Sequence, residues 1–239
     1  MGHGWEGAVL KLLRAKDFVF TVTGAEEVAE RYRRLHFTDG GMLAMSGVHP
    51  TMWVRLWFDN AGKPHQRAYT LVDPDPEAGT FSLEFALHEG AASDWCRTAQ
   101  PGDTIEGTLY GTAWTEPDPL PGRMFVVGDA AALPAINSLL EALPQVPATI
   151  WFETADSSEA ELPFRTDPDR HDLRLVPREG RGERLVAEVR ESLPGLVAEP
   201  ERAYVWITAY GSTTRELTAF ARKELGVPKQ RVHSMAYWR

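Results

Sequence analysis

Four consecutive residues, Arg67, Ala68, Tyr69 and Thr70, have side chains that suit a flat, phosphorylated ligand. On a β-strand, Arg67 and Tyr69 share one face and lie roughly 7 Å apart, because each residue adds about 3.3 Å. A guanidinium grips phosphate oxygens with a planar fork of donors, and a flat ligand can lie on the neighbouring phenol ring. The Thr70 hydroxyl can hydrogen-bond the edge of that ligand. Taken alone, the pattern also fits an ordinary exposed strand with a solvated arginine.

A second set of residues follows about twenty positions later, where His88 precedes Gly90, Ala91, Ala92 and Ser93. The small residues let the backbone come close to a ligand, and we expect Ser93 to cap a helix that begins there. The N–H groups and positive dipole end of such a helix form an anion site. His88 lies on the polar face of its predicted strand, toward the ligand side. A solvated or turn-stabilising histidine fits this position equally well.

The third set is a tight turn and a helix start after an apolar strand, and it comprises Gly128, Asp129, Ala132, Leu133 and Pro134. Strand–turn–helix crossings bind the phosphates of nicotinamide nucleotides in Rossmann-like sheets. Only one glycine is present, so the G-x-G-x-x-G pattern is not met. Pro134 falls in the first helical turn, where a missing N–H does no harm.

The elements that must position the first two sets are short segments of alternating polarity. Residues 52–58 and 81–88 place their apolar side chains on one face, as in a half-buried strand. Turn-forming residues follow at 59–62 and 74–79. Regularly spaced strands of this kind predict an antiparallel barrel or sandwich.

The pattern changes after residues 115–122, which contain three prolines and suit a junction between domains. Strand and helix patterns then alternate, which predicts a parallel α/β sheet. The predicted strands are residues 124–127, 148–152, 173–176, 204–208 and 231–238. The last helix is expected to begin with a capping box formed by Thr213 and Glu216.

The composition argues against several classes of protein. A formal charge of −9 on 239 residues, with no run of Lys and Arg, argues against a nucleic-acid binder. The single cysteine, Cys96, excludes an internal disulfide and a cysteine-built metal site. Residues 1–10 lack the pattern of a signal peptide, and no apolar run is long enough to span a bilayer. We therefore expect a cytoplasmic protein with no membrane or nucleic-acid partner.

Taken together, these residues resemble the siderophore-interacting protein family, the FAD-dependent ferric-siderophore reductases. The resemblance covers nearly the whole chain, and it rests on Arg67 to Thr70, residues 88–95, Pro101-Gly102-Asp103, residues 128–136 and the closing Tyr237-Trp238-Arg239. It implies a ferredoxin-reductase-like fold: an antiparallel FAD-binding β-barrel at residues 1–118, then a parallel, Rossmann-like α/β domain at 119–239. It also implies that FAD binds at the first two sets of residues, and that the third set contacts a nucleotide.

The mechanism that the resemblance implies needs no side chain as acid or base, and we name no catalytic residue. A donor, either NAD(P)H or a ferredoxin, reduces FAD, and electrons pass singly to Fe(III) in a siderophore. Two alternatives stay open: a flavin reductase of another acceptor on the same fold, and a non-catalytic flavin- or siderophore-binding protein.

The chain departs from the family pattern at several positions. Ala130 and Ala131 replace an acid and a hydroxyl, Val72 stands where an arginine is usual, and the late strand runs into Ala209 and Tyr210. These departures predict weak use of NAD(P)H and favour a small electron-transfer protein such as a ferredoxin.

Overall fold

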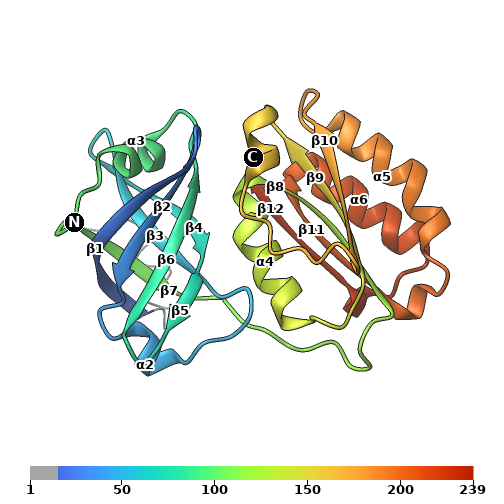
Figure 1. Cartoon of the computed structure of the whole chain (residues 1–239), viewed down its shortest axis with the longest axis horizontal. Coiled ribbons are helices and arrows are strands. Elements are labelled where there is room, and N and C mark those ends of the chain that lie inside the picture. Colours follow the sequence, from blue (N-terminus) through green and yellow to red (C-terminus); the bar gives the residue numbers. More distant parts are fainter. Residues whose placement is uncertain (1–15, 239) are drawn as a thin grey trace. The chain divides into compact units, whose positions relative to one another are not determined.

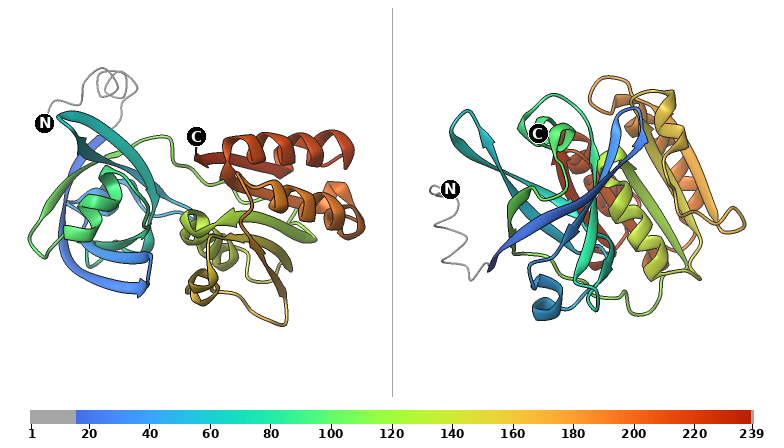
Figure 2. Two further views of the ribbon diagram at one scale, coloured as in Figure 1. Left: turned by 90° about the horizontal axis from the view of Figure 1, so that it is seen from above. Right: turned by 60° about the vertical axis from the view of Figure 1, so that its left-hand side comes forward.

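The computed structural model describes residues 16–238 and divides the chain into two compact units, the first ending at Trp114 and the second beginning at Thr115. Figures 1 and 2 show the elements of each unit. Within residues 16–238, no helix is both long and apolar enough to cross a membrane. The N-terminal segment discussed above and Arg239 lie outside the described residues.

Within residues 16–114, seven strands form one antiparallel sheet in the order β4-β3-β7-β1-β2-β6-β5. The sheet curls into a barrel-like shape, as predicted (Figure 1). The strands are β1 (Lys16–Ala29), β2 (Tyr32–Thr38), β3 (Trp53–Asn60), β4 (Lys63–Thr70), β5 (Val72–Asp75), β6 (Thr80–Ala86) and β7 (Thr104–Leu109). Helices α2 (Met42–Ser46) and α3 (Ala91–Thr98) lie at opposite ends of the curled sheet.

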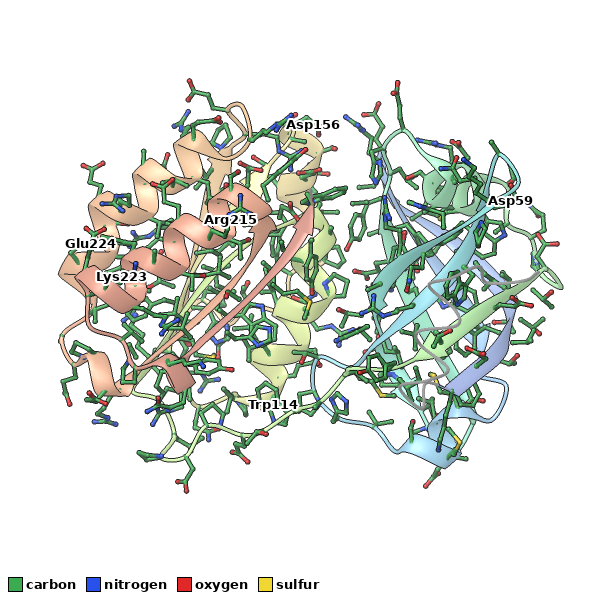
Figure 3. The ribbon with its side chains drawn as sticks, turned by 180° about the vertical axis from the view of Figure 1, so that it is seen from behind. Asp59, Trp114, Asp156, Arg215, Lys223 and Glu224 are labelled. Atoms are coloured by element: carbon green, nitrogen blue, oxygen red, sulfur yellow. The ribbon has the colours of Figure 1, made fainter. Side chains whose placement is uncertain are left out.

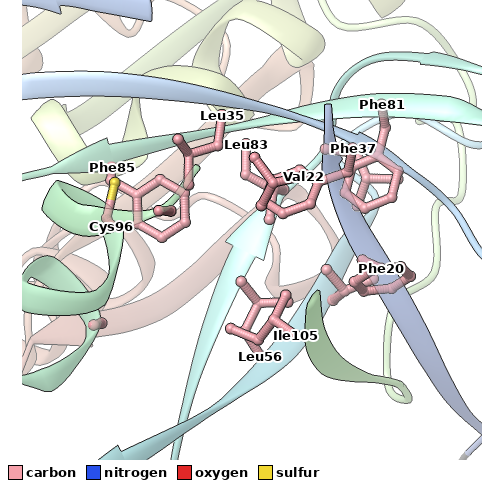
Figure 4. Close-up of a cluster of buried hydrophobic side chains, with 14 of the residues drawn as sticks. Phe20, Val22, Leu35, Phe37, Leu56, Phe81, Leu83, Phe85, Cys96 and Ile105 are labelled. Carbon is pink, nitrogen blue, oxygen red and sulfur yellow. The ribbon is translucent and has the colours of Figure 1, made fainter. Parts of the chain in front are cut away.

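The predicted alternation on β3 and β6 is confirmed. Val54 and Leu56 are fully buried in the core of this unit, as are Leu83 and Phe85, and Figure 4 shows Leu56, Leu83 and Phe85 in that core. Glu84 lies on the opposite face of β6 and is also buried. Its carboxylate accepts hydrogen bonds from the Tyr32 hydroxyl at 2.8 Å and from Arg34 Nη2 at 2.6 Å, which compensates for its burial.

The β3–β4 hairpin closes through Ala61 and Gly62, whose φ angles of 52° and 78° are typical of a type I′ turn. Asp59 Oδ1 accepts a hydrogen bond from the Gly62 N–H at 2.8 Å. The turn sets the pairing of β4 on β3, in which Tyr69 lies opposite Val54. The first set of candidate residues is thus positioned on a strand, as predicted.

Within residues 115–238, five parallel strands form a sheet in the order β10-β9-β8-β11-β12. They are β8 (Arg123–Asp129), β9 (Ala148–Thr154), β10 (His171–Pro177), β11 (Ala203–Tyr210) and β12 (Val232–Trp238). Helices α5 (Glu183–Leu196) and α6 (Gly211–Ala219) cover one face, and α4 (Leu133–Ala142) covers the other (Figures 1 and 2). Helical turns lie at η1 (Ala130–Ala132), η2 (Ser157–Glu161), η3 (Pro200–Arg202), η4 (Phe220–Glu224) and η5 (Lys229–Arg231).

The capping box predicted for the last helix is wrong. Helix α6 begins at Gly211, two residues before Thr213, so Thr213 lies inside the first turn. The Thr213 hydroxyl donates a hydrogen bond to the carbonyl of Arg181 at 2.9 Å. This contact holds α6 against the segment that leads into α5, and it takes the hydroxyl away from the helix's own N–H groups.

Gly107 on β7 is required by packing in the first unit. A Cβ added there would lie 2.1 Å from Cε2 of Phe20, a fully buried core residue. Gly107→Ala should therefore displace the Phe20 ring and lower the free energy of unfolding by about 1–3 kcal/mol or more. Thermal or urea unfolding of the purified variant measures this loss.

Gly195→Ala is the matched control, because the same added methyl group at the exposed Gly195 of α5 meets nothing within 4 Å. It should leave stability unchanged or raise it by about 0.5–1 kcal/mol through helix propensity. Equal stability of Gly107→Ala and the wild type would contradict the packing argument.

Candidate functional site

Strand β4 presents the first set of candidate residues as the sequence predicts. Arg67 is exposed, and its Nη1 donates a hydrogen bond to the Gln66 carbonyl at 3.0 Å. Tyr69 is half-buried on the same face of the strand, and Thr70 at the end of β4 is buried. The Arg67 guanidinium is thus accessible to a phosphate, and the neighbouring Tyr69 ring is partly packed into the core.

The turn before α3 has a backbone that only glycine adopts readily. Gly90 has φ 134° and ψ 163°, a region nearly closed to residues with a Cβ. It is also the N-cap of α3, so no side chain caps the helix. The first N–H groups of a helix have no acceptor within it. An uncapped, glycine-led helix start fits the pyrophosphate of a dinucleotide such as FAD.

Ser93 does not cap α3, contrary to our expectation. It lies in the first helical turn, and its buried hydroxyl accepts a hydrogen bond from the His88 backbone N–H at 3.1 Å. The His88 ring donates from Nδ1 to the Glu89 carbonyl at 2.6 Å, and Arg97 Nη2 donates to the His88 carbonyl at 3.1 Å. His88 and Ser93 therefore stabilise the turn, and the N–H groups at the helix start stay uncapped.

Four aromatic side chains join the two sets of residues. The Tyr69 ring lies 4.4 Å from Phe85 on β6 and 6.3 Å from Phe58 on β3. Trp95 of α3 lies 5.8 Å from Phe58 and 6.4 Å from Phe85. We call Phe58, Tyr69, Phe85 and Trp95 the aromatic cluster. Phe58 and Phe85 thus contact both Tyr69 of β4 and Trp95 of α3, which links the two sets of residues through the core.

The pKa of Tyr69 reflects both its burial and the charge of Arg67. Burial raises the pKa of the Tyr69 hydroxyl, and the nearby Arg67 charge opposes that rise in pKa. The hydroxyl therefore stays protonated and able to donate a hydrogen bond. Burial also raises the pKa of the thiol of Cys96, on the buried face of α3, to about 12, so this cysteine is an inert part of the core.

In the second unit, the candidate turn follows β8 as predicted, but its side chains point into the core. Ala132 and Leu133 are fully buried and Pro134 is buried with them. A Cβ on Gly128 would lie 2.9 Å from Ala132 Cβ, so this glycine allows β8 and the helical turn to pack closely. Any contact of these four residues with a nucleotide would therefore come from the backbone.

Asp129 is the polar centre of this turn, at the carboxyl end of β8. It is fully buried, and its Oδ1 accepts the Ala131 N–H at 3.0 Å while Oδ2 accepts the Trp238 indole N–H at 2.6 Å. The pKa of the Asp129 carboxyl is raised to about 6, chiefly by burial and also by the negative charge of nearby Glu153. The Trp238 hydrogen bond and the Arg178 guanidinium, 3.9 Å away, oppose the rise in pKa.

Several residues of this region were missed at the level of sequence. Glu153, the penultimate residue of β9, lies directly beside Asp129 in the sheet register, and Arg178 Nε donates to its Oε2 at 2.8 Å. The sequence offered one indication of the role of Glu153, namely that it is an acid near the carboxyl end of a predicted buried strand. The pairing of Trp238 with Asp129, 109 positions apart, had no local indication.

Comparison with known proteins identifies both units. Residues 121–239 match the family described as "Siderophore-interacting protein", and residues 21–108 match "Siderophore-interacting FAD-binding domain". The mycobactin import ATP-binding/permease protein IrtA of Mycolicibacterium smegmatis is 32% identical over 247 residues, which cover 100% of this chain and 28% of IrtA. The ferric vibriobactin reductase ViuB of Vibrio cholerae is 25% identical, over 74% of this chain and 65% of ViuB. The chain therefore spans only part of each of these curated relatives.

Solved structures agree on the fold. The siderophore-interacting protein from Acinetobacter baumannii superposes with a TM-score of 0.77 at 21% identity, over 94% of this chain and 91% of that chain. A ferredoxin NADP+ reductase from Neisseria gonorrhoeae, solved with FAD and NADP, gives 0.68 at 16% identity, over 93% and 99%. The predicted ferredoxin-reductase-like fold is confirmed.

Arg67→Ala should weaken FAD binding. The change removes an accessible guanidinium beside Tyr69, and a charge-assisted phosphate contact is worth roughly 1.5–3 kcal/mol, or about 10- to 150-fold in Kd. Fluorescence titration of the apoprotein with FAD measures the change. Lys63→Ala, which removes an exposed cation from the other end of β4, should leave the Kd unchanged. Equal losses in both variants would indicate a general effect of charge.

Asp129→Asn should flatten the dependence of stability on pH. The folded state holds a proton on Asp129 up to about pH 6, whereas the unfolded carboxyl loses it near its ordinary pKa of 3.8. This carboxyl therefore contributes stability below about pH 4 that is lost as the pH rises through 6, by up to about 3 kcal/mol. Thermal unfolding midpoints across pH 4–7 measure the slope.

A second variant should shift the pH dependence of stability in a known direction. Trp238→Phe removes the hydrogen bond that lowers the Asp129 pKa, so the loss of stability should extend to higher pH. If the wild type and Asp129→Asn show the same slope between pH 4 and 6, Asp129 does not take up a proton in this range.

Proposed function

The chain belongs to the siderophore-interacting protein family, and we propose that it uses FAD to reduce ferric iron held by a siderophore, releasing Fe(II). The observation that carries the proposal lies in the first unit, where Arg67 is exposed on the same face of β4 as Tyr69, and the Tyr69 ring and the uncapped helix α3 pack against the same two phenylalanines. The name of ViuB, a ferric vibriobactin reductase, supports the choice of reaction. We place the reaction in the cytoplasm, since the single cysteine needs no oxidising compartment.

The residues of the first unit bind and orient the cofactor. Arg67 and the α3 N–H groups hold the pyrophosphate, and Tyr69 offers an aromatic face with a protonated hydroxyl. Thr70 donates to the edge of the ring system, while His88 and Ser93 keep the turn closed. When bound, FAD supplies the redox chemistry, taking two electrons from a donor and releasing them singly to the ferric substrate. Hard oxygen ligands hold Fe(II) far less tightly than Fe(III), so one electron loosens the complex.

The electron donor in this proposal is a small electron-transfer protein such as a ferredoxin, with NAD(P)H as a weak substitute. Asp129 Oδ1 occupies the Ala131 N–H, which would otherwise face a phosphate at the helix start. Glu153 adds a second buried carboxylate beside it, against the single cation of Arg178. A negatively charged turn with an occupied N–H disfavours the phosphates of a nicotinamide nucleotide.

Ferric siderophore should reoxidise the reduced flavoprotein faster than buffer does in the absence of oxygen. Ferric mycobactin and ferric vibriobactin are the first substrates to test, since the names of IrtA and ViuB contain these siderophores. Stopped-flow absorbance follows the flavin, and a coloured Fe(II) chelator traps the product. The gallium(III) complexes are matched controls, because gallium is not reduced in this range. Equal reoxidation rates with iron, with gallium and with buffer would sink the proposed reaction.

NADPH and NADH should reduce the bound flavin slowly and only at high concentration. Two or three missing hydrogen bonds at Ala130, Ala131 and Ala209, each worth about 0.5–1.5 kcal/mol, weaken binding roughly ten- to a thousand-fold. Anaerobic stopped-flow with a range of NADPH concentrations measures this, with a reduced ferredoxin as the comparison. Bleaching of the flavin within a second at low micromolar NADPH would overturn this choice of donor.

A further inference from the structure

A basic groove lies on the second unit, between the end of α6 and the start of β12. It has a volume of about 560 Å³, which is in the range of small-molecule sites. Four cations line it: Arg215 from α6, Arg222 and Lys223 from the turn η4, and Lys229 from η5. Figure 3 shows Arg215 and Lys223 projecting from this helical segment. We call this cavity the basic groove.

The four cations have no acidic partners. Within residues 16–238, none of them forms an ion pair, although the chain has 34 acidic and 25 basic side chains. The nearby Glu224 is already bound to Arg190, with Oε2 3.1 Å from Nη2. Four like charges around one cavity repel one another. Water and salt screen part of this repulsion because the side chains are exposed, and a bound anion relieves the rest.

The helix dipole does not explain this placement. Cations in the last turn of a helix are stabilised by its negative end, which accounts for Arg222 and Lys223. Arg215 lies in the first half of α6, where the dipole does not favour a cation. Lys229 follows the helix and belongs to a separate turn. The common feature of the four is the groove itself.

Hydroxyl groups complete the lining. Thr214 and Ser234 face the groove from α6 and β12. Thr214 is buried, and its Oγ1 has no hydrogen-bond partner within residues 16–238, which is costly for a hydroxyl group. The helix widens to a π-helical turn at η4, a feature often found at functional sites. Forked guanidinium groups, ammonium groups and hydroxyls together match phosphate oxygens.

We propose that the basic groove binds a small, soluble molecule that carries clustered phosphate groups. The site is separate from the residues assigned to FAD, which lie in the first unit, and from Asp129 at the carboxyl end of β8. A concave cavity of this volume encloses several phosphates, and the four cations balance a ligand of three to four negative charges. The inference goes beyond the proposed reductase reaction and does not depend on it.

Isothermal titration of the FAD-saturated protein with sodium tripolyphosphate tests the proposal. The wild type should bind one tripolyphosphate, more weakly at high ionic strength. Arg222→Gln with Lys223→Gln should raise the Kd at least about tenfold. Ser234→Glu, which adds a carboxylate and removes no cation, should weaken binding as well. The matched control is Arg184→Gln with Lys63→Gln, the same charge change at exposed residues that do not line the groove, and its Kd should equal that of the wild type.

Three results would overturn the proposal. The first is no binding of tripolyphosphate by the wild type. The second is an equal loss of affinity in the groove variant and in the control, because binding would then follow total charge. The third is sedimentation with phosphatidylglycerol vesicles in the absence of binding to free tripolyphosphate, because the groove would then recognise a lipid surface. Thermal unfolding of each variant confirms that the folded protein is compared.

Discussion

The aromatic cluster is the contact on which the cofactor site depends. Tyr69 belongs to β4, at one end of the strand order, and Phe85 belongs to β6, next to the other end, so their contact at 4.4 Å requires the sheet to curl. Trp95 packs α3 on β3 and β6. Large aromatic side chains contribute much of the apolar area buried in a small core. Core packing and the candidate site are therefore coupled here, because Phe58 and Phe85 hold both Tyr69 and α3.

The candidate site of the second unit is built from charged side chains, whereas that of the first unit depends on apolar packing. Ligands of open α/β sheets bind at the carboxyl ends of the strands. In this chain, that edge has two buried carboxylates on adjacent strands, Asp129 and Glu153, with Arg178 and Trp238 as partners. Burial is the main cause of the raised pKa of Asp129, and Glu153 adds to the rise, while the Trp238 hydrogen bond and Arg178 oppose it. The edge at which ligands of such sheets bind thus holds two buried acids in this chain.

Local patterns predicted much of this structure. The alternation on β3 and β6, the helix at Leu133–Ala142 and the parallel order after the linker all follow from hydrophobic periodicity, which is a local property. The side-chain roles that failed depend on hydrogen-bond partners outside the helix itself. Ser93 and Thr213 have the residue type of helix caps, but Ser93 accepts from the His88 N–H and Thr213 donates to the Arg181 carbonyl. Packing outside the helix decides which partner each hydroxyl takes.

Strand β12 is the last strand of its sheet in chain order. It pairs with β11 and supplies the Trp238 indole that donates to Asp129. During synthesis on the ribosome, β8 to β11 therefore emerge before their last neighbour exists. Until β12 arrives, β11 has an open edge that can pair with another chain, and the Asp129 carboxylate keeps its hydration. The sheet of the second unit is thus complete only after β12 has been synthesised. Before that point, the unpaired edge of β11 makes the unit most prone to misassembly.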